Sequence, residues 1–289
     1  MKSIHIVEET LPVAWEKAVI ACWEQGDSFP TQYDKPNDPN SRDVLACIHV
    51  KNPFAEPRIH RSFPAGLSSL ETYRAEVLWG VHDYYMQDTT NPHRWEYTYH
   101  QRLFNYNTEK ETRSQDGTSW KQTIDQIAAC VRMLKKCGHT RRAQAVTWQA
   151  WNDLEIADPA CLQRLWFRVQ DNKLNMTVHM RSNDAYKAAY MNMYAFTELQ
   201  RTVAEEVGVQ PGEYIHVADS FHIYGSYFNE FEGALKTFKN RSYEDKVWNT
   251  EFAKDFFVEG CDELLAEKGM PEDCVQKVKQ RKEELMRQT

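Results

Sequence analysis

The sequence lacks several features that would place it in common classes of protein. Its first residues contain no long apolar stretch of the kind found in a signal peptide. No segment approaches the roughly 20 consecutive apolar residues that cross a bilayer. The seven cysteines include no CxxC pair, and their odd number is untypical of a disulfide framework. These absences predict a cytoplasmic protein with free thiols, no membrane partner and no metal site.

The chain also has no run of basic residues, no internal repeat and no low-complexity tract. Its formal net charge is −7, which gives no electrostatic reason to expect nucleic acid as a partner. An anionic small molecule could still bind, but only through a local cluster of arginines. What the chain does contain is 13 Phe, 14 Tyr and 9 Trp, enough for a sizeable core. Because no linker divides residues 1–289, we expect one domain.

Hydrophobic periodicity predicts a mixture of helices and strands without regular βαβ units. We expect an α+β fold with a mainly antiparallel or mixed sheet packed by helices. Residues 165–169 and 174–180 alternate around the turn at 171–173, which predicts a hairpin. The other predicted elements are loops over 25–65 flanking a strand at 44–50, helices over 67–88, 117–138 and 184–207, a strand over 214–224, and a charged surface helix over 271–287.

Each candidate for chemistry has an ordinary structural explanation when taken alone. Cys161 precedes a predicted strand, and a lone cysteine is more often a small buried hydrophobe than a nucleophile. A histidine in an apolar run, such as His222, is usually a buried core residue whose ring nitrogens are hydrogen-bonded. Asn192 lies within an apolar helix, where its amide costs stability unless it finds partners. Arg141 and Arg142 could form a solvated helix end.

Together, these residues form a constellation. In order they are Asp-Gln-Ile (125–127), Thr-Arg-Arg (140–142), Pro-Ala-Cys (159–161), Arg-Ser-Asn-Asp (181–184), Asn192 and His-Ile-Tyr (222–224). Upstream stand Ser-Arg-Asp (41–43), Ala-Glu-Val-Leu-Trp (75–79) and Trp95. In order and spacing this set resembles thymidylate synthase and the related pyrimidine-nucleotide hydroxymethylases. Many motifs across most of the chain make the resemblance far more specific than any single match.

The resemblance implies transfer of a one-carbon unit to C5 of a pyrimidine nucleotide. Cys161 would add to C6 as a thiolate, with its pKa lowered by neighbouring arginine charge. C5 would then attack the methylene carbon of 5,10-methylenetetrahydrofolate, the co-substrate. Glu76 would act as general acid and base around the folate and the base O4. Asp184 would bind the pterin ring, and Trp95 would pack near the transferred carbon.

The resemblance also implies how the nucleotide is bound. Arg42 and Arg181 from one subunit, with Arg141 and Arg142 from its partner, would hold the phosphate, so we expect a homodimer that packs through a face of the sheet. Ser182 would add a hydroxyl donor to the same phosphate, and His222 and Tyr224 would bind the sugar 3′-hydroxyl. Asn192 would donate to O4 of uracil and accept from N3–H, which favours dUMP over a cytosine nucleotide.

Three departures from ordinary thymidylate synthases favour a hydroxymethyl product, formed by water, over a methyl product, formed by hydride. Ala160 precedes the nucleophile where those enzymes have proline, and Asn183 stands where they have cysteine. The chain ends in Leu-Met-Arg-Gln-Thr after a charged helix instead of a small apolar tail. We therefore expect a dUMP 5-hydroxymethylase, of cellular or phage origin. The alternatives are a thymidylate synthase, a (d)CMP hydroxymethylase, a non-catalytic nucleotide-binding homologue, and a cysteine hydrolase that uses Cys161 with His222.

Overall fold

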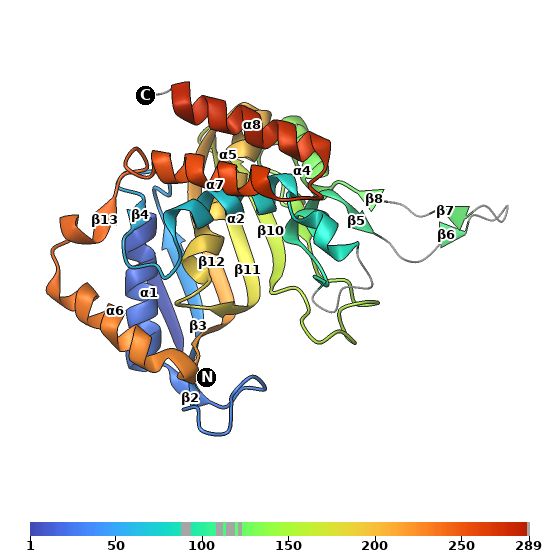
Figure 1. Ribbon diagram of the computed structural model, residues 1–289. Helices are drawn as coiled ribbons and strands as arrows, with labels where there is room; N and C mark the ends of the chain where they lie inside the picture. The colour runs from blue at the N-terminus through green and yellow to red at the C-terminus, as the bar shows by residue number, and fades with distance from the viewer. Residues whose placement is uncertain (88–93, 108–111, 114–118, 121–122, 288–289) are drawn as a thin grey trace.

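The centre of the molecule is a seven-stranded sheet (Figure 1). Six strands follow the order β1-β3-β12-β11-β10-β9, and the seventh, β2, pairs with the first residues of β3. The computed structural model describes residues 1–87, 94–107, 112–113, 119–120 and 123–287. The strands of the sheet are β1 (Ser3–Glu8), β2 (Asp27–Phe29), β3 (Ser41–Val50), β9 (Gln144–Val146), β10 (Leu162–Gln170), β11 (Lys173–Asp184) and β12 (Gln210–Ile223).

The sheet is mixed. The β1–β3 and β11–β12 pairs are parallel, whereas β2–β3, β3–β12, β10–β11 and β9–β10 are antiparallel. Three further pairs of two-residue strands lie outside it. They are β4 (Ile59–His60) with β13 (Val247–Trp248), β5 (Tyr106–Asn107) with β8 (Thr123–Ile124), and β6 (Thr112–Arg113) with β7 (Ser119–Trp120). The predicted α+β class with a mixed sheet is confirmed.

Helices cover one face of the sheet in successive layers. α1 (Leu11–Gln25) and α5 (Ala189–Val207) pack on the strands, α2 (Leu67–Trp79) packs on α5, α7 (Lys254–Ala266) on α2, and α8 (Glu272–Arg287) on α7 (Figure 1). The remaining helices are α3 (Tyr99–Phe104), α4 (Gln126–Lys136), α6 (Phe228–Asn240), and the short 3₁₀ helices η1 (Asp83–Met86), η2 (Gly225–Tyr227) and η3 (Glu244–Lys246). Within the described ranges, none of these helices is both long enough and apolar enough to cross a bilayer.

Alternation along the strands explains why only one face is covered. On β3, Val44, Ala46 and Ile48 are buried beneath helices, whereas Leu45, Cys47 and His49 on the opposite face are only half-buried. A strand with period-2 burial has one face in the core and leaves the other available. We call this second side the open face of the sheet.

The hairpin prediction is confirmed. β10 and β11 pair antiparallel, and Asp171 and Asn172 between them have φ of 51° and 58°. Two left-handed residues in a two-residue turn match the right-handed twist of the strands, and Asn and Asp tolerate this conformation better than other non-glycine residues.

Several predicted boundaries were wrong for identifiable reasons. The helix predicted over 67–88 ends at Trp79, because Gly80 turns left-handed (φ 67°) and its N–H bonds the Glu76 carbonyl. The helix predicted from Gly117 begins at Gln126, where the Asp125 side chain caps the N–H of Ala128 at 2.8 Å. Residues 117–118 and 121–122 of that prediction lie outside the described ranges.

The helix predicted from 184 begins at Ala189, and the strand predicted over 214–224 is the longer β12. The segment 25–65 contains β2 and β4 as well as the predicted strand. The charged C-terminal helix is present, but it also buries Cys274, Val278 and Leu285. Four helices, α1, α3, α6 and α7, were not predicted. That the whole chain forms one domain stays a prediction.

A buried ion pair fixes the segment that leads to Cys161. Arg102 on α3 makes a bidentate pair with Asp153, with Nη2 2.7 Å from Oδ1 and Nη1 3.2 Å from Oδ2, and both side chains are almost fully buried. Arg102 also donates to the Thr147 carbonyl, and Asp153 accepts from the Gln149 N–H at 2.8 Å. The pair therefore ties residues 147–153 to α3.

We expect Arg102→Ala to lower the free energy of unfolding by about 3–5 kcal/mol, since it leaves the Asp153 carboxylate buried without its partner. Chemical denaturation followed by circular dichroism measures the loss. The control is Glu283→Ala, which removes an exposed pair with Arg287 and should change stability by about 0.5 kcal/mol or less. Equal losses in the two variants would contradict this account of the ion pair.

Candidate functional site

The β10–β11 hairpin brings Arg181 beside Cys161. Cys161 immediately precedes β10, and its carbonyl accepts the backbone N–H of Arg181 at 2.8 Å. The guanidinium Nη2 of Arg181 lies 3.6 Å from the Cys161 sulfur and donates to the Pro159 carbonyl at 2.8 Å. A half-buried thiol thus has one cation in contact with it, held by the backbone of the same loop.

The expectation of a lowered pKa for Cys161 was wrong for this chain alone. Burial raises the pKa of the Cys161 thiol above its ordinary value, and the nearby Asp158 raises it further. The charge of Arg181 and a hydrogen bond with Tyr97 lower the pKa, but they do not offset the loss of hydration. The thiol form is therefore favoured at this position in the single chain.

A cavity of about 380 Å³ lies between α2 and the loop that precedes Cys161. Its lining residues are Tyr73, Glu76, Arg94, Trp95, Glu96, Tyr97, Thr98, Tyr99 and Asp158. Tyr97 connects the cavity to Cys161 through the thiol hydrogen bond, and the Tyr99 hydroxyl accepts the N–H of Leu162 at 3.3 Å. The cavity thus combines aromatic walls with three carboxylates, those of Glu76, Glu96 and Asp158, and Tyr97 links it to the thiol.

Glu76 and Trp95 share this cavity, as the resemblance implies. Glu76 lies on α2, and its Oε2 is 3.0 Å from Nδ1 of His82. Trp95 is about one-third exposed, and its ring packs against the rings of Tyr85 and His82. Sequence reasoning missed His82 and Asp158. The position of Asp158, three residues before Cys161, was the available signal.

Asn192 is buried on α5, and its Oδ1 accepts the Tyr73 hydroxyl at 2.5 Å. Tyr73 precedes Glu76 by three residues, so both side chains lie on one face of α2. The hydrogen bond explains how an amide is accommodated in an apolar helix. It also connects the Asn192 amide to the cavity that Tyr73 and Glu76 line.

A second polar group forms where β11 and β12 end, because Asp184 and His222 are paired across the two strands. His222 is 5% exposed, and within the described chain its buried Nε2 has no hydrogen-bond partner. Its ring lies 4.5 Å from that of Tyr224. Burial, together with the charges of Asp184, Tyr33, Cys161 and Asp158, raises the pKa of Tyr224 to about 12. Tyr224 therefore lies within electrostatic range of the thiol.

Asp184 is not among the residues that line the 380 Å³ cavity within the described ranges. Its Oδ1 accepts the N–H groups of Tyr186 and Lys187, at 3.0 and 2.8 Å, and its Oδ2 accepts the Tyr227 hydroxyl. The carboxylate thus shapes the turn into α5. Ser182 lies two residues earlier on β11 and is half-buried.

The remaining arginines differ in exposure. Arg42 on β3 is half-buried, donates to the Gly26 carbonyl at 3.4 Å and lies over the Trp23 ring. Arg141 and Arg142 are exposed in the segment between α4 and β9. Only Arg181, of the four arginines predicted to bind phosphate, contacts the Cys161 thiol in the described chain.

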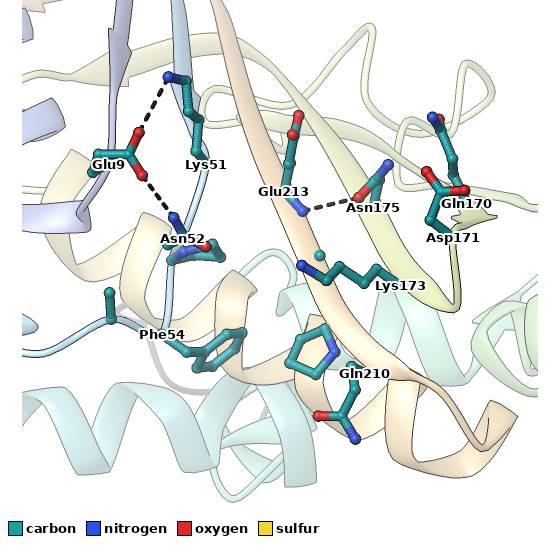
Figure 2. A pocket seen from close by; sticks show the side chains of 14 residues that line it. Glu9, Lys51, Asn52, Phe54, Gln170, Asp171, Lys173, Asn175, Gln210 and Glu213 are labelled. Carbon is teal, nitrogen blue, oxygen red and sulfur yellow. Dashed lines mark hydrogen bonds and ion pairs between the residues drawn. The ribbon is translucent and has the colours of Figure 1, made fainter.

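A larger cavity, of about 790 Å³, lies at the opposite end of β10, around the hairpin turn (Figure 2). None of the predicted site residues lines it. Glu9 there is paired with Lys51 and Asn52, at 3.1 and 2.6 Å, and Asn175 accepts the N–H of Glu213. Because none of the predicted site residues lines this cavity, we place the candidate site at the smaller cavity, which Tyr97 links to Cys161.

The thymidylate synthase family profile matches residues 70–260. The chain belongs to the thymidylate synthase family. A protein of Methanocaldococcus jannaschii named "Putative thymidylate synthase" is 32% identical over 225 residues, covering 76% of this chain and 90% of that protein. A protein of the same name from Methanosarcina mazei is 29% identical over 223 residues, covering 77% and 90%. The resemblance predicted from the motifs is confirmed at the level of the family, and the chain is a one-carbon transferase.

The raised pKa of Cys161 predicts how the ligand-free protein reacts with iodoacetamide. Only the thiolate reacts, so the alkylation rate should keep rising with pH through a midpoint above the ordinary thiol value of about 8.5. Arg181→Gln should move the midpoint further upward, since it removes the charge that favours the thiolate. Mass spectrometry of the Cys161 peptide measures the rate, with Cys161→Ser as the control. A midpoint near or below neutrality would contradict the prediction.

Proposed function

We propose that the protein is a dUMP 5-hydroxymethylase that uses 5,10-methylenetetrahydrofolate and water through a covalent adduct between Cys161 and C6 of the base. The observation that supports this best is that Glu76 and Asp158 line one cavity together with Glu96, and that Tyr97 of the same cavity hydrogen-bonds the Cys161 thiol. Two carboxylates in a small cavity can hold and deprotonate water, and water at the transferred carbon gives a hydroxymethyl product.

Cys161 is the proposed nucleophile. Its sulfur forms the bond to C6, and the electron pair released at C5 forms the bond to the one-carbon unit, which the folate supplies in electrophilic form. Arg181 supports the assignment, because its guanidinium lies 3.6 Å from the sulfur and favours the thiolate as the bond forms. Loss of the C5 proton and departure of tetrahydrofolate leave an exocyclic methylene on C5. Water adds to this carbon as hydroxide, and the C6–S bond breaks to restore the C5–C6 double bond and regenerate the thiolate.

Base recognition is assigned to Asn192. With Oδ1 fixed by the Tyr73 hydroxyl, the Nδ2 group can donate, and the second lone pair of Oδ1 can accept. A donor matches O4 and an acceptor matches N3–H of uracil, whereas cytosine presents the opposite pattern at those positions. This supports dUMP over dCMP or CMP as substrate.

The sugar and phosphate would lie toward the ends of β11 and β12. Within the described chain, Nε2 of buried His222 has no hydrogen-bond partner. Because buried polar atoms normally have partners, this supports a ligand hydroxyl beside His222. Tyr224 beside it would share the 3′-hydroxyl. Arg181 and Ser182 would bind the phosphate with Arg42.

The residues around the 380 Å³ cavity are suited to a reduced pterin. Tyr73, Tyr97 and Trp95 offer flat apolar surfaces, and Glu76 offers an acceptor for ring N–H groups. In the proposed reaction Glu76 transfers protons around the base O4 and the folate nitrogens, and Asp158 orients water. Asp184 stays the proposed contact for the far side of the pterin ring.

Thymidylate synthase is the second candidate, and the names of the two relatives favour it. It would use the same nucleophile, base-reading amide and general acid. The difference lies in the last step, where a hydride from the reduced folate replaces water and leaves dihydrofolate. The hydroxymethyl assignment therefore rests on Asp158 and on the sequence departures near Cys161 and at Asn183.

The proposed dimer packs through the open face of the sheet and completes the phosphate site. Arg141 and Arg142 are exposed in the single chain, which supports a role toward a neighbouring subunit. In this arrangement each active site takes Cys161 and Arg181 from one subunit and the two exposed arginines from the other.

The folate product separates the two candidate functions. Given dUMP and methylenetetrahydrofolate, the protein should release the C5 proton and form hydroxymethylated dUMP while the folate product stays tetrahydrofolate. The reason is that water attack consumes no hydride. Mass spectrometry identifies the nucleotide, and absorbance follows dihydrofolate. Cys161→Ser is the control and should abolish proton release. Dihydrofolate formation matched by dTMP would establish the second candidate instead.

Subunit complementation tests the shared active site. Arg142→Ala and Cys161→Ser should each be inactive, but random mixing should restore about one quarter of wild-type activity, because half of the dimers are hybrids with one complete site of two. Activity is measured after reversible dissociation of equal amounts, and native mass spectrometry verifies the hybrid. A verified hybrid without activity would contradict the contribution of Arg142 in trans.

A further inference from the structure

His82 is held between two carboxylates, one of which is Glu76. Its Nδ1 lies 3.0 Å from Oε2 of Glu76, and its Nε2 lies 3.3 Å from Oε2 of Glu267. Glu267 directly follows α7 and lies beyond residues 70–260, the segment that matches the family. The C-terminal part of the chain thus reaches the proposed general acid and base through one imidazole.

Aromatic side chains enclose this bridge. The His82 ring stacks on Tyr85 at 5.1 Å and packs against the ring of Trp95 at 5.5 Å. The hydroxyls of Tyr84 and Tyr85 donate to Oε2 of Glu267, at 2.9 and 3.3 Å. His82 itself is only 6% exposed.

The charged groups around His82 favour its imidazolium form. A neutral imidazole has a single N–H, so it can donate to only one of two carboxylates, whereas the imidazolium donates to both. Burial by itself lowers the pKa of His82, but the hydrogen bonds and charges of Glu76 and Glu267 outweigh burial and raise it. The other nearby carboxylate, that of Asp83, bonds His100 and Thr98 instead.

We propose that His82, kept protonated by Glu267, is a positioning residue that fixes Glu76 in the cavity and sets the alkaline limit of turnover. The proposal rests on the proposed function, in which Glu76 moves protons at the reacting base. Both hydrogen bonds exist together only while His82 is an imidazolium, because after deprotonation Glu76 and Glu267 compete for a single N–H. The orientation of Glu76 therefore depends on the protonation of a residue that does not touch the substrate.

The direction of the pH dependence follows from the geometry. A group with a raised pKa in the folded state stays protonated above its ordinary value of about 6.5, and the bridge is lost as pH rises through the folded value. Below the pKa of His82 in the folded protein, the ring donates to both Glu76 and Glu267. Above that pKa, one of the two hydrogen bonds is missing. Turnover should accordingly fall on the alkaline side, whereas KM for the nucleotide should change little.

Two variants test the proposal. Glu267→Gln keeps hydrogen-bonding groups but removes the charge, so the alkaline limb of kcat should move to lower pH. His82→Gln removes the titrating group, so this limb should disappear, and kcat should fall by up to about 100-fold through misplacement of Glu76. The readouts are C5 proton release from dUMP with methylenetetrahydrofolate across pH, and NMR titration of the His82 ring protons in wild type and Glu267→Gln.

Matched controls remove comparable groups elsewhere. Glu263→Gln neutralises an exposed carboxylate on the same helix α7, and His60→Gln removes another buried imidazole, which is paired with Glu16 at 2.8 Å. Neither should move the alkaline limb, although His60→Gln should lower thermal stability.

The outcomes separate this proposal from the proposed function. An active wild type whose alkaline limb is unchanged in Glu267→Gln and His82→Gln would overturn the role of His82 and leave the proposed function intact. No C5 proton release from any pyrimidine nucleotide by the wild type would overturn both. If His82→Gln does not fold, Glu267→Gln decides, because an unmoved limb with an unmoved His82 titration would contradict the bridge.

Discussion

The register of the β10–β11 hairpin is the constraint on which the candidate site depends. Asp171 and Asn172 form a two-residue left-handed turn, which fixes the pairing from Gln170 and Lys173 to Arg164 and His179, and an irregularity between Leu162 and Arg164 then shifts the register before Cys161. At the far end of that ladder Arg181 meets the backbone of Cys161, and its guanidinium reaches the sulfur. A slip of one residue would turn Arg181 to the other face of the sheet, because side chains alternate with period two.

Layered helices place the other half of the site. α5 is buried around most of its circumference, and it carries Asn192 between the sheet and α2. α2 then presents Tyr73 and Glu76 one turn apart, so a single helix face supplies both the partner of Asn192 and the proposed general acid. Gly80 ends α2 with a left-handed turn, and His82 follows at the position that contacts Glu76. Helix packing and helix termination together define the cavity.

Much of this was accessible from the sequence, for physical reasons. The hairpin could be predicted because alternation and turn chemistry act locally, and the chemistry-bearing residues could be grouped because motif order and spacing are specific. The Glu76–His82–Glu267 bridge could not be predicted, since Glu267 is 185 residues from His82 and depends on how α7 packs on α2. The raised pKa of Cys161 was missed for a similar reason. Charge is visible in a sequence, whereas the loss of hydration that outweighs it depends on the folded surroundings.

Burial favours the neutral form of both Cys161 and His82, and the charges around each group decide which form prevails. Cys161 has Arg181 on one side and Asp158 nearby, so desolvation prevails and the neutral form is favoured. His82 has carboxylates at both ring nitrogens, so electrostatic attraction prevails and the charged form is favoured. A second cation near Cys161 would lower the pKa of its thiol. The phosphate-binding arginines proposed to come from the partner subunit are such cations. In that arrangement a single chain holds a protonated thiol near the cavity that Glu76 lines, and assembly of the two subunits supplies the missing positive charge.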